Sequence, residues 1–311
     1  MKISFIIPCF NEEKNVEKMK DSISSAYKNY DDVITELIFI DDGSSDNTLE
    51  NLRKLKSDTK TEIKVIELSR HFGKESAMFA GLSLSSGDYI CNIDADGQQE
   101  PIITVKMFDT LKKNKNLDCV TAVAKKRKEK FTQVFFKSLF YKTMNFISET
   151  EFVNGASDFR MYTRQVANCI LGMKEYHRFT KGIFSFVGFN TIYIEYTPLE
   201  RKTSKSKWSF KKLYYYALEG FTSFGSHLLN SLFIIGILLF IASIIMFIKF
   251  VSSNGIEGYF FDLPAIFLLN FIMLIESIKL PVLALLSEYL SKIYIQSKNR
   301  PVFIIKNSYN L

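Results

Sequence analysis

Cysteine is scarce in this chain, and the few cysteines present are not spaced as ligands or redox partners. The sequence has four, namely Cys9, Cys91, Cys119 and Cys169, and none forms a Cys-x-x-Cys pair. Three of them lie in apolar, strand-like stretches. This pattern disfavours zinc and dithiol chemistry and favours buried free thiols in a reducing compartment over disulfides.

Two familiar nucleotide-binding motifs are also missing. No Gly-x-Gly-x-x-Gly follows the first apolar run, and Gly73-Lys74 lacks the glycine five positions earlier that a P-loop needs, because that position is Leu68. A dinucleotide dehydrogenase and a P-loop ATPase are therefore disfavoured. The apolar run from Met1 to Pro8 is too short for a signal peptide, so we expect the N-terminal part of the chain to stay in the cytosol.

Composition allows a large core and suggests an anionic partner. The chain has 311 residues, of which 47% are hydrophobic, and 40 Lys and Arg against 33 Asp and Glu give a net charge of +7. That length fits one large domain or two smaller ones. The positive charge fits a membrane surface, phosphates or nucleic acid, and its location along the chain has to decide between them.

The first 124 residues alternate short strand-like runs with amphipathic helical stretches. Such alternation predicts an α/β domain with a doubly wound, mostly parallel sheet. The expected strands are Ile3–Pro8, Ile34–Asp41, Ile63–Leu68, Asp88–Ile93 and Asp118–Ala124.

Carboxylates follow several of these strands directly. Asp41 and Asp42 end the second strand, and Asp94 and Asp96 follow the fourth, one residue apart. Ligands of open α/β sheets collect at the carboxyl ends of the strands, and two close carboxylates favour a hard cation that shares its shell with substrate phosphates. An EF-hand is excluded because its fifth and twelfth positions are Gln98 and Val105. A solvated turn with an Asp helix cap is the alternative for an isolated Asp-x-Asp pair.

Basic and aromatic segments follow the predicted sheet. A basic stretch over 125–130 precedes an amphipathic stretch over 131–147, and 201–212 holds six basic residues around Trp208. These segments fit either helices at a membrane surface or charged, solvated faces of core helices. Between them lies the polar cluster Asn154–Arg160, whose Asp158 is a second candidate for chemistry. His71 is a candidate base, although a packing or hydrogen-bonding role is favoured for it.

Two long apolar runs near the C-terminus predict membrane-spanning helices. Leu228–Ile248 has no charged residue, and Leu263–Leu286 contains only Glu276 and Lys279. Each is long enough for the ~20 residues that cross a bilayer core. The basic outer flanks then predict a multi-pass protein of the cell membrane whose N-terminal domain and tail face the cytoplasm. A soluble protein with two core helices is the alternative. Glu276 and Lys279 share one helical face, which suggests a homo-oligomer, and nucleic acid is disfavoured as a partner.

The predicted organisation has four parts. Residues 1–200 form the catalytic domain, 201–227 a basic amphipathic segment, 228–286 two transmembrane helices with a short external loop, and 287–311 a cytoplasmic tail.

Several of these motifs, in this order, resemble glycosyltransferase family 2 and its polyisoprenyl-phosphate glycosyltransferase branch. The resemblance covers nearly the whole chain and implies a Rossmann-like GT-A catalytic domain. It rests on Ile7-Pro8-Cys9-Phe10-Asn11-Glu12-Glu13, Asp41-Asp42-Gly43-Ser44, Asp94-Ala95-Asp96-Gly97-Gln98, Asp158-Phe159-Arg160, Arg201 with Ser206-Lys207-Trp208, and Glu288-Tyr289-Leu290 with Arg300-Pro301.

The resemblance also implies roles for individual residues. It assigns nucleotide binding to Pro8, Glu12 and Asp42, and Mg²⁺ or Mn²⁺ binding to Asp94, Asp96 and Gln98. It assigns the acceptor phosphate to Arg127, Lys137, Arg201 and Lys207, and it marks Asp158 and Asp96 as catalytic. Asp158 matches the base proposed in the family. A phosphate acceptor is largely dianionic at neutral pH, however, so Asp158 can instead serve to orient it.

The implied activity is a metal-dependent, inverting transfer of one sugar from a nucleotide-sugar to a polyprenyl phosphate at the cytoplasmic membrane face. UDP-glucose and undecaprenyl phosphate are the expected substrates, and N-acetylglucosamine, galactose or mannose donors are alternatives. Ile102 and Gln99-Glu100 depart from the family pattern, which weakens the inference of the donor. The Gln-x-x-Arg-Trp element of processive synthases is absent, which favours single-sugar transfer. A catalytically silent scaffold for a flippase or transferase is the alternative of another class.

Overall fold

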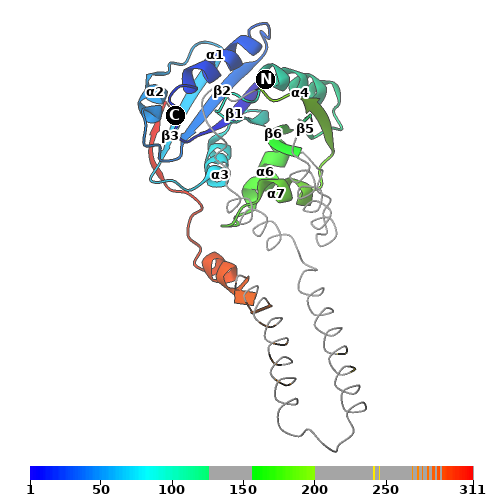
Figure 1. Cartoon of the computed structure of the whole chain (residues 1–311). Coiled ribbons are helices and arrows are strands. Elements are labelled where there is room, and N and C mark those ends of the chain that lie inside the picture. The colour runs from blue at the N-terminus through cyan, green and yellow to red at the C-terminus, as the bar shows by residue number, and fades with distance from the viewer. Residues whose placement is uncertain are drawn as a thin grey trace, which may run out of the picture.

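A computed structural model describes residues 1–125, 156–199 and 289–310, together with isolated positions between 241 and 287. Figure 1 shows these parts in colour. The acceptor-phosphate candidates Arg127, Lys137, Arg201 and Lys207 all lie outside the described residues, as do Glu276 and the two basic amphipathic segments. Their predicted roles stay predictions.

The described part is built on one eight-stranded sheet. Its strand order is β7-β5-β6-β4-β1-β2-β3-β8. The four strands β4, β1, β2 and β3 run parallel to one another, and β5 is parallel to β7, while β6 and β8 run antiparallel to their neighbours. The Rossmann-like, mostly parallel α/β class is therefore confirmed. The strands are β1 (Lys2–Cys9), β2 (Ile34–Asp41), β3 (Thr61–Leu68), β4 (Tyr89–Asn92), β5 (Cys119–Ala124), β6 (Ala156–Thr163), β7 (Thr191–Tyr196) and β8 (Ile305–Tyr309).

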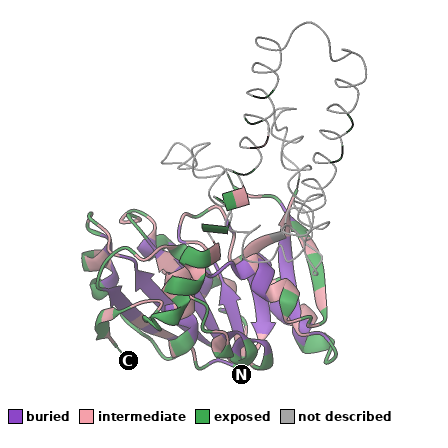
Figure 2. Cartoon of the chain, turned by 90° about the horizontal axis from the view of Figure 1, so that it is seen from below, coloured by how far each residue is buried: buried purple, intermediate pink, exposed green. Residues whose placement is uncertain are grey.

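Helices cover both faces of the sheet, so the described part is a three-layer α/β/α structure. The side chains of β1 show how the two cores are separated, since Phe5 and Ile7 belong to one buried cluster and Ile6 to the other. This alternation follows from the two-residue period of a strand. One face carries α1 (Val16–Ala26), α2 (Thr48–Lys54) and α4 (Ile102–Lys113), and the other carries α3 (Lys74–Leu84), α6 (Arg164–Gly172) and α7 (Thr180–Phe186). Figure 2 shows the buried strands between exposed helix surfaces.

Helix α3 lies unusually close to the centre of the sheet. A Cβ atom on Gly81 would come within 2.7 Å of side-chain atoms of Ile6 and Ile40. A glycine is therefore required for this approach.

The C-terminal segment returns to the sheet. Strand β8 pairs with the edge strand β3, and Figure 1 shows it in red beside β3 and α2. Glu67 of β3 holds β8 by accepting hydrogen bonds from Lys306 Nζ (2.6 Å), Asn307 Nδ2 (2.9 Å) and the Tyr309 hydroxyl (3.2 Å). The segment expected to be only a cytoplasmic tail thus supplies a strand to the catalytic sheet and covers its edge.

The two predicted membrane-spanning helices need correction. Among the residues that the structure describes, no helix is long and apolar enough to cross a membrane. This finding contradicts the predicted transmembrane pair and the multi-pass membrane location. Most of 228–286 lies outside the described residues.

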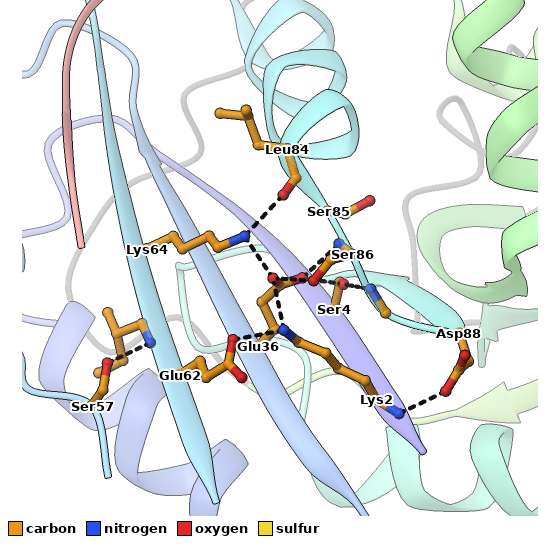
Figure 3. Close-up of polar contacts among 12 residues, drawn as sticks. Lys2, Ser4, Glu36, Ser57, Glu62, Lys64, Leu84, Ser85, Ser86 and Asp88 are labelled. Atoms are coloured by element: carbon orange, nitrogen blue, oxygen red, sulfur yellow. Dashed lines mark hydrogen bonds and ion pairs between the residues drawn. The ribbon is translucent and has the colours of Figure 1, made fainter. Parts of the chain in front are cut away.

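A buried carboxylate joins the strands at the amino-terminal edge of the sheet, opposite the candidate site. Glu36 of β2 is fully buried and accepts hydrogen bonds from Ser4 and Ser86, and Lys64 Nζ lies 2.8 Å from its Oε1 atom (Figure 3). Burial raises the pKa of Glu36, but the bonds from Lys64, Ser4 and Ser86 outweigh it, and the pKa falls to about 2. Glu36 is therefore an ionised anchor between β1, β2, β3 and the start of β4.

Candidate active site

Polar loops after β1 and β2 form one end of the candidate site. The Asn11 side chain accepts a hydrogen bond from the Ser45 amide (2.8 Å), and the Asn11 amide donates to Ser44 Oγ (3.0 Å). The Glu12 amide donates to Thr48 Oγ1 at 2.8 Å. These bonds lock the two loops together, with Pro8 and Glu12 partly exposed at the edge where the nucleotide was predicted to bind.

Asp42 connects the β2 loop to the loop before α3. It is buried, and its carboxylate accepts hydrogen bonds from the backbone amides of Phe72 (2.7 Å) and Gly73 (2.9 Å). His71 Nδ1 lies 2.8 Å from Asp42 Oδ2. Both carboxylate oxygens of Asp42 thus have partners within the protein, and the favoured hydrogen-bonding role of His71 agrees with this contact.

The His71 ring also stacks on Phe10. Their ring centroids lie 4.2 Å apart with an interplanar angle of 26°. Both side chains are exposed at the carboxyl edge of β1 and β2. Gly43 permits this arrangement because its φ is +70°, and a Cβ atom there would lie 2.7 Å from the His71 amide nitrogen.

The loop after β4 holds Asp94 by a side-chain clamp. Gln99 is buried, accepts a hydrogen bond from the Asp94 amide (2.9 Å) and donates one to Asp94 Oδ2 (3.0 Å). Asp96 accepts a hydrogen bond from the Gln98 amide at 3.1 Å, which closes the turn. The predicted set Asp94, Asp96 and Gln98 therefore lies on one tight loop, and the sequence did not indicate the clamp by Gln99.

Strand β6 brings Asp158 to the same place. It pairs antiparallel with β4, with Asn92 opposite Arg160. Continuing this register by two residues sets Asp158 opposite Asp94. Asp158 was expected in a turn, whereas the structure places it near the beginning of a strand.

Lys74, the first residue of α3, links the two carboxylates. Its Nζ atom lies 2.6 Å from Asp94 Oδ1 and 3.2 Å from Asp158 Oδ2. Burial lowers the pKa of Lys74, but Asp94 and Asp158 outweigh this effect and raise it above its ordinary value. Lys74 was not among the predicted site residues. A signal was present, because a lysine in the first turn of a helix opposes the helix dipole.

The surroundings of Asp158 keep it ionised. Burial raises its pKa, but the positive charges of Lys74, Lys181 and Arg160 outweigh burial and lower the pKa to about 2. Next to Lys74, Glu75 accepts hydrogen bonds from the amide and hydroxyl of Thr180 in α7. Burial, followed by repulsion from Asp158, raises the pKa of Glu75 to about 7. Two neighbouring carboxyl groups thus differ strongly in proton affinity.

The residues at this edge fit a cation that is only partly coordinated by protein. Among the described residues, no group of three or more His, Cys, Asp and Glu forms a metal cluster. Asp94 and Asp96 offer two carboxylates, and one of them already pairs with an ammonium group. Mg²⁺ and similar ions are commonly held by one or two carboxylates together with substrate phosphates. These carboxylate ligands therefore suit a metal ion that binds together with a diphosphate.

The chain is similar over its whole length to proteins named as glycosyltransferases. The bactoprenol glucosyl transferase of Shigella phage SfV is 35% identical, over 99% of this chain and 99% of that protein. CsbB of Bacillus subtilis (strain 168), named as a glycosyltransferase, is 35% identical over 98% of this chain and 92% of that protein. Among solved structures, a mannosyltransferase from Pyrobaculum calidifontis in complex with GDP-Man and Mn²⁺ has a TM-score of 0.47 and 16% identity, with 66% of this chain and 58% of that chain covered.

The family model that matches is described as glycosyl transferase family 2. It spans residues 4–171, which include β1 from Ser4 onward, every strand from β2 to β6, and the residues Asp42, Asp94, Asp96 and Asp158. The chain is therefore a glycosyltransferase and belongs to glycosyltransferase family 2.

Proposed function

We propose that this glycosyltransferase transfers one glucosyl residue from UDP-glucose to a polyprenyl phosphate. The observation that carries the proposal is the meeting of Asp94 and Asp158 at one ammonium group, with Lys74 Nζ 2.6 Å and 3.2 Å from their oxygens. With a metal at Asp94 and Asp96, such an arrangement would bring a donor diphosphate close to an anionic acceptor near Lys74 and Asp158. The full-length similarity to a protein named bactoprenol glucosyl transferase supports a glucosyl donor and a polyprenyl phosphate acceptor.

The donor would occupy the edge formed by the loops after β1, β2 and β4. Asp94, Asp96 and Gln98 are the proposed ligands of Mg²⁺ or Mn²⁺, which would neutralise charge on the departing diphosphate. Pro8, Glu12 and Asp42 are the proposed nucleotide-binding residues. The exposed Phe10–His71 stack offers an aromatic face to the base.

The reaction would be a direct displacement at the anomeric carbon. An oxygen of the acceptor phosphate forms the new bond to this carbon while the bond to the nucleoside diphosphate breaks, which inverts the configuration. The acceptor needs little deprotonation, because the second pKa of a phosphate monoester is ~6. Asp158, whose pKa is about 2, is a poor proton acceptor at neutral pH and serves here to orient the acceptor and the basic groups around it.

A donor panel tests this proposal. Purified full-length protein is incubated with polyprenyl phosphate and labelled UDP-glucose, UDP-N-acetylglucosamine, UDP-galactose or GDP-mannose, and the organic extract is counted. Label from UDP-glucose alone supports the proposal. Preference for another sugar would overturn the donor assignment, and no transfer from any donor, with an equally inert Asp96→Asn variant, would favour a catalytically silent scaffold.

A further inference from the structure

Both carboxylate oxygens of Asp94 already have partners, and one of these partners, the ammonium group of Lys74, is a cation that a bound metal ion would repel. Oδ2 accepts a hydrogen bond from Gln99 Nε2 at 3.0 Å, and Oδ1 lies 2.6 Å from Lys74 Nζ. Gln99 is buried and is also bonded to the Asp94 amide. Lys74 instead reaches Asp94 through a flexible, partly exposed side chain. Lys74 is therefore the partner that can leave.

A second carboxylate stands ready to receive the displaced ammonium group. Lys74 Nζ is already 3.2 Å from Asp158 Oδ2. Within the described part of the chain, the other oxygen, Asp158 Oδ1, is buried and has no hydrogen-bond partner. A buried, ionised oxygen without a donor is costly, and a small movement of Lys74 toward it would supply one.

We propose that Lys74 is a positioning residue that occupies Asp94 in the absence of metal and passes to Asp158 when a divalent cation binds. The inference rests on the proposed metal-binding role of Asp94. An ammonium group cannot remain on the same oxygen as a divalent cation, because two positive charges at that separation repel strongly in a partly buried site. Asp158 keeps the displaced charge close by and lowers the free energy of metal binding.

The proposal predicts a specific coupling in Mn²⁺ affinity, measured on the full-length protein with Mn²⁺ alone by the loss of its free-ion EPR signal. Lys74→Met should bind Mn²⁺ about tenfold more tightly, since its competitor is gone. Asp158→Asn should bind about three- to tenfold more weakly, because Lys74 then stays on Asp94. In the double variant, Asp158→Asn should have little further effect. If Asp158 acts only through its own negative charge, Asp158→Asn would weaken Mn²⁺ binding by the same factor in the Lys74→Met background as in the wild type.

Two controls keep the outcomes separate. Lys181→Met removes another cation near Asp158 but should change Mn²⁺ affinity less than about twofold, because Asp94 is not its partner. Lys74→Gln and thermal unfolding of each variant exclude loss of the fold as the cause. If Asp94→Asn leaves Mn²⁺ binding intact, or if the wild type binds no Mn²⁺ even when UDP is present, the proposed metal site is wrong. If Asp94→Asn abolishes binding but the effects of Lys74 and Asp158 are additive, only the displacement is wrong.

Discussion

Gln99 bonds to both the backbone amide and the carboxylate of Asp94, at 2.9 Å and 3.0 Å. One buried amide side chain thereby fixes the orientation of the acidic residue that we assign to the metal. Replacing a residue that orients a ligand in this way commonly lowers metal affinity or activity by about 10- to 100-fold.

Replacing Gln99 should therefore impair the site without removing a ligand. Gln99→Leu is expected to weaken Mn²⁺ affinity and lower kcat/KM by about 10- to 100-fold, because Asp94 loses its orienting bonds. Titration of activity against Mn²⁺ measures both effects. Glu100→Gln, one residue further on, is the matched control and should behave like the wild type. Equal behaviour of the two variants would mean that Gln99 has no orienting role.

The role of Asp158 can be tested by its pH dependence. Since its pKa is about 2, the residue is ionised and weakly basic throughout the useful pH range. Asp158→Asn should keep most of its turnover at pH 8, within about threefold, and lose it near pH 5.5, where the acceptor phosphate gains a proton at its second pKa of ~6. Initial rates across this range provide the measurement. A loss of about 1,000-fold at pH 8 as well would identify Asp158 as the general base.

Glu36 should make the protein sensitive to acid. Its folded-state pKa of about 2 lies below the ordinary value of 4.5, so its contribution is complete above pH 4.5 and is lost as the pH falls toward 2. The shift corresponds to a free energy of unfolding on the order of 3 kcal/mol. At pH 7 the free energy of unfolding of the Glu36→Gln variant should be lower than that of the wild type by about that amount. Below pH 4.5 the difference between the two proteins should become smaller, and urea unfolding measures both values.

Glu62→Gln is the control for Glu36. Lys2 Nζ lies 3.3 Å from Glu36 Oε1 and 2.6 Å from Glu62 Oε2, but the Glu62 side chain is 46% exposed. Its loss should cost no more than about 0.5 kcal/mol. A similar cost for both variants would show that burial of Glu36 is not what makes its network stabilising.

The parallel part of the fold was readable from the sequence because apolar runs of five to eight residues mark buried strands. Ile34–Asp41 was predicted with its observed bounds, and Ile3–Pro8 lies within the observed strand Lys2–Cys9. The polar residues at the ends of these strands indicated the edge that carries the candidate site. Buried parallel strands give a strong local signal, and this is why these predictions were confirmed.

The remaining strands could not be recognised because their pairing is not local. Strand β8, Ile-Lys-Asn-Ser-Tyr, is polar and mostly exposed, and it is defined by contacts with Glu67, more than 200 positions away in sequence. Near its beginning, strand β6 has the polar residues Ser157 and Asp158, which suggested a turn. Lys74 was overlooked for the same reason, since its importance depends on two carboxylates from distant strands.

The C-terminal segment should stabilise the helix that carries Lys74. Phe303 packs edge-on against Phe79 of α3 at a centroid distance of 6.0 Å. The guanidinium group of Arg178 lies over the same Phe79 ring, 3.8 Å from its centroid. Phe303→Ala should reduce the free energy of unfolding by about 1–2 kcal/mol and lower turnover, because α3 loses part of its packing. Urea unfolding and initial rates measure the two effects.

Ile304→Ala is the matched variant for this prediction. Ile304 is the next residue in the chain, and its side chain is 50% exposed. Its replacement should cost less than about 0.5 kcal/mol and leave turnover unchanged. If Phe303→Ala behaves in the same way, the C-terminal segment does not support α3.

The central claim is that the edge carrying Asp94 and Asp158 transfers a single sugar with the help of a divalent cation. The most direct measurement is the mass and yield of the glycolipid formed from UDP-glucose and polyprenyl phosphate after EDTA treatment, with and without added Mg²⁺ or Mn²⁺. We predict no product in EDTA, recovery on addition of metal, a mass increase of one hexose, and no recovery in Asp94→Asn. Full activity in EDTA, or a product that carries several sugars, would contradict the account.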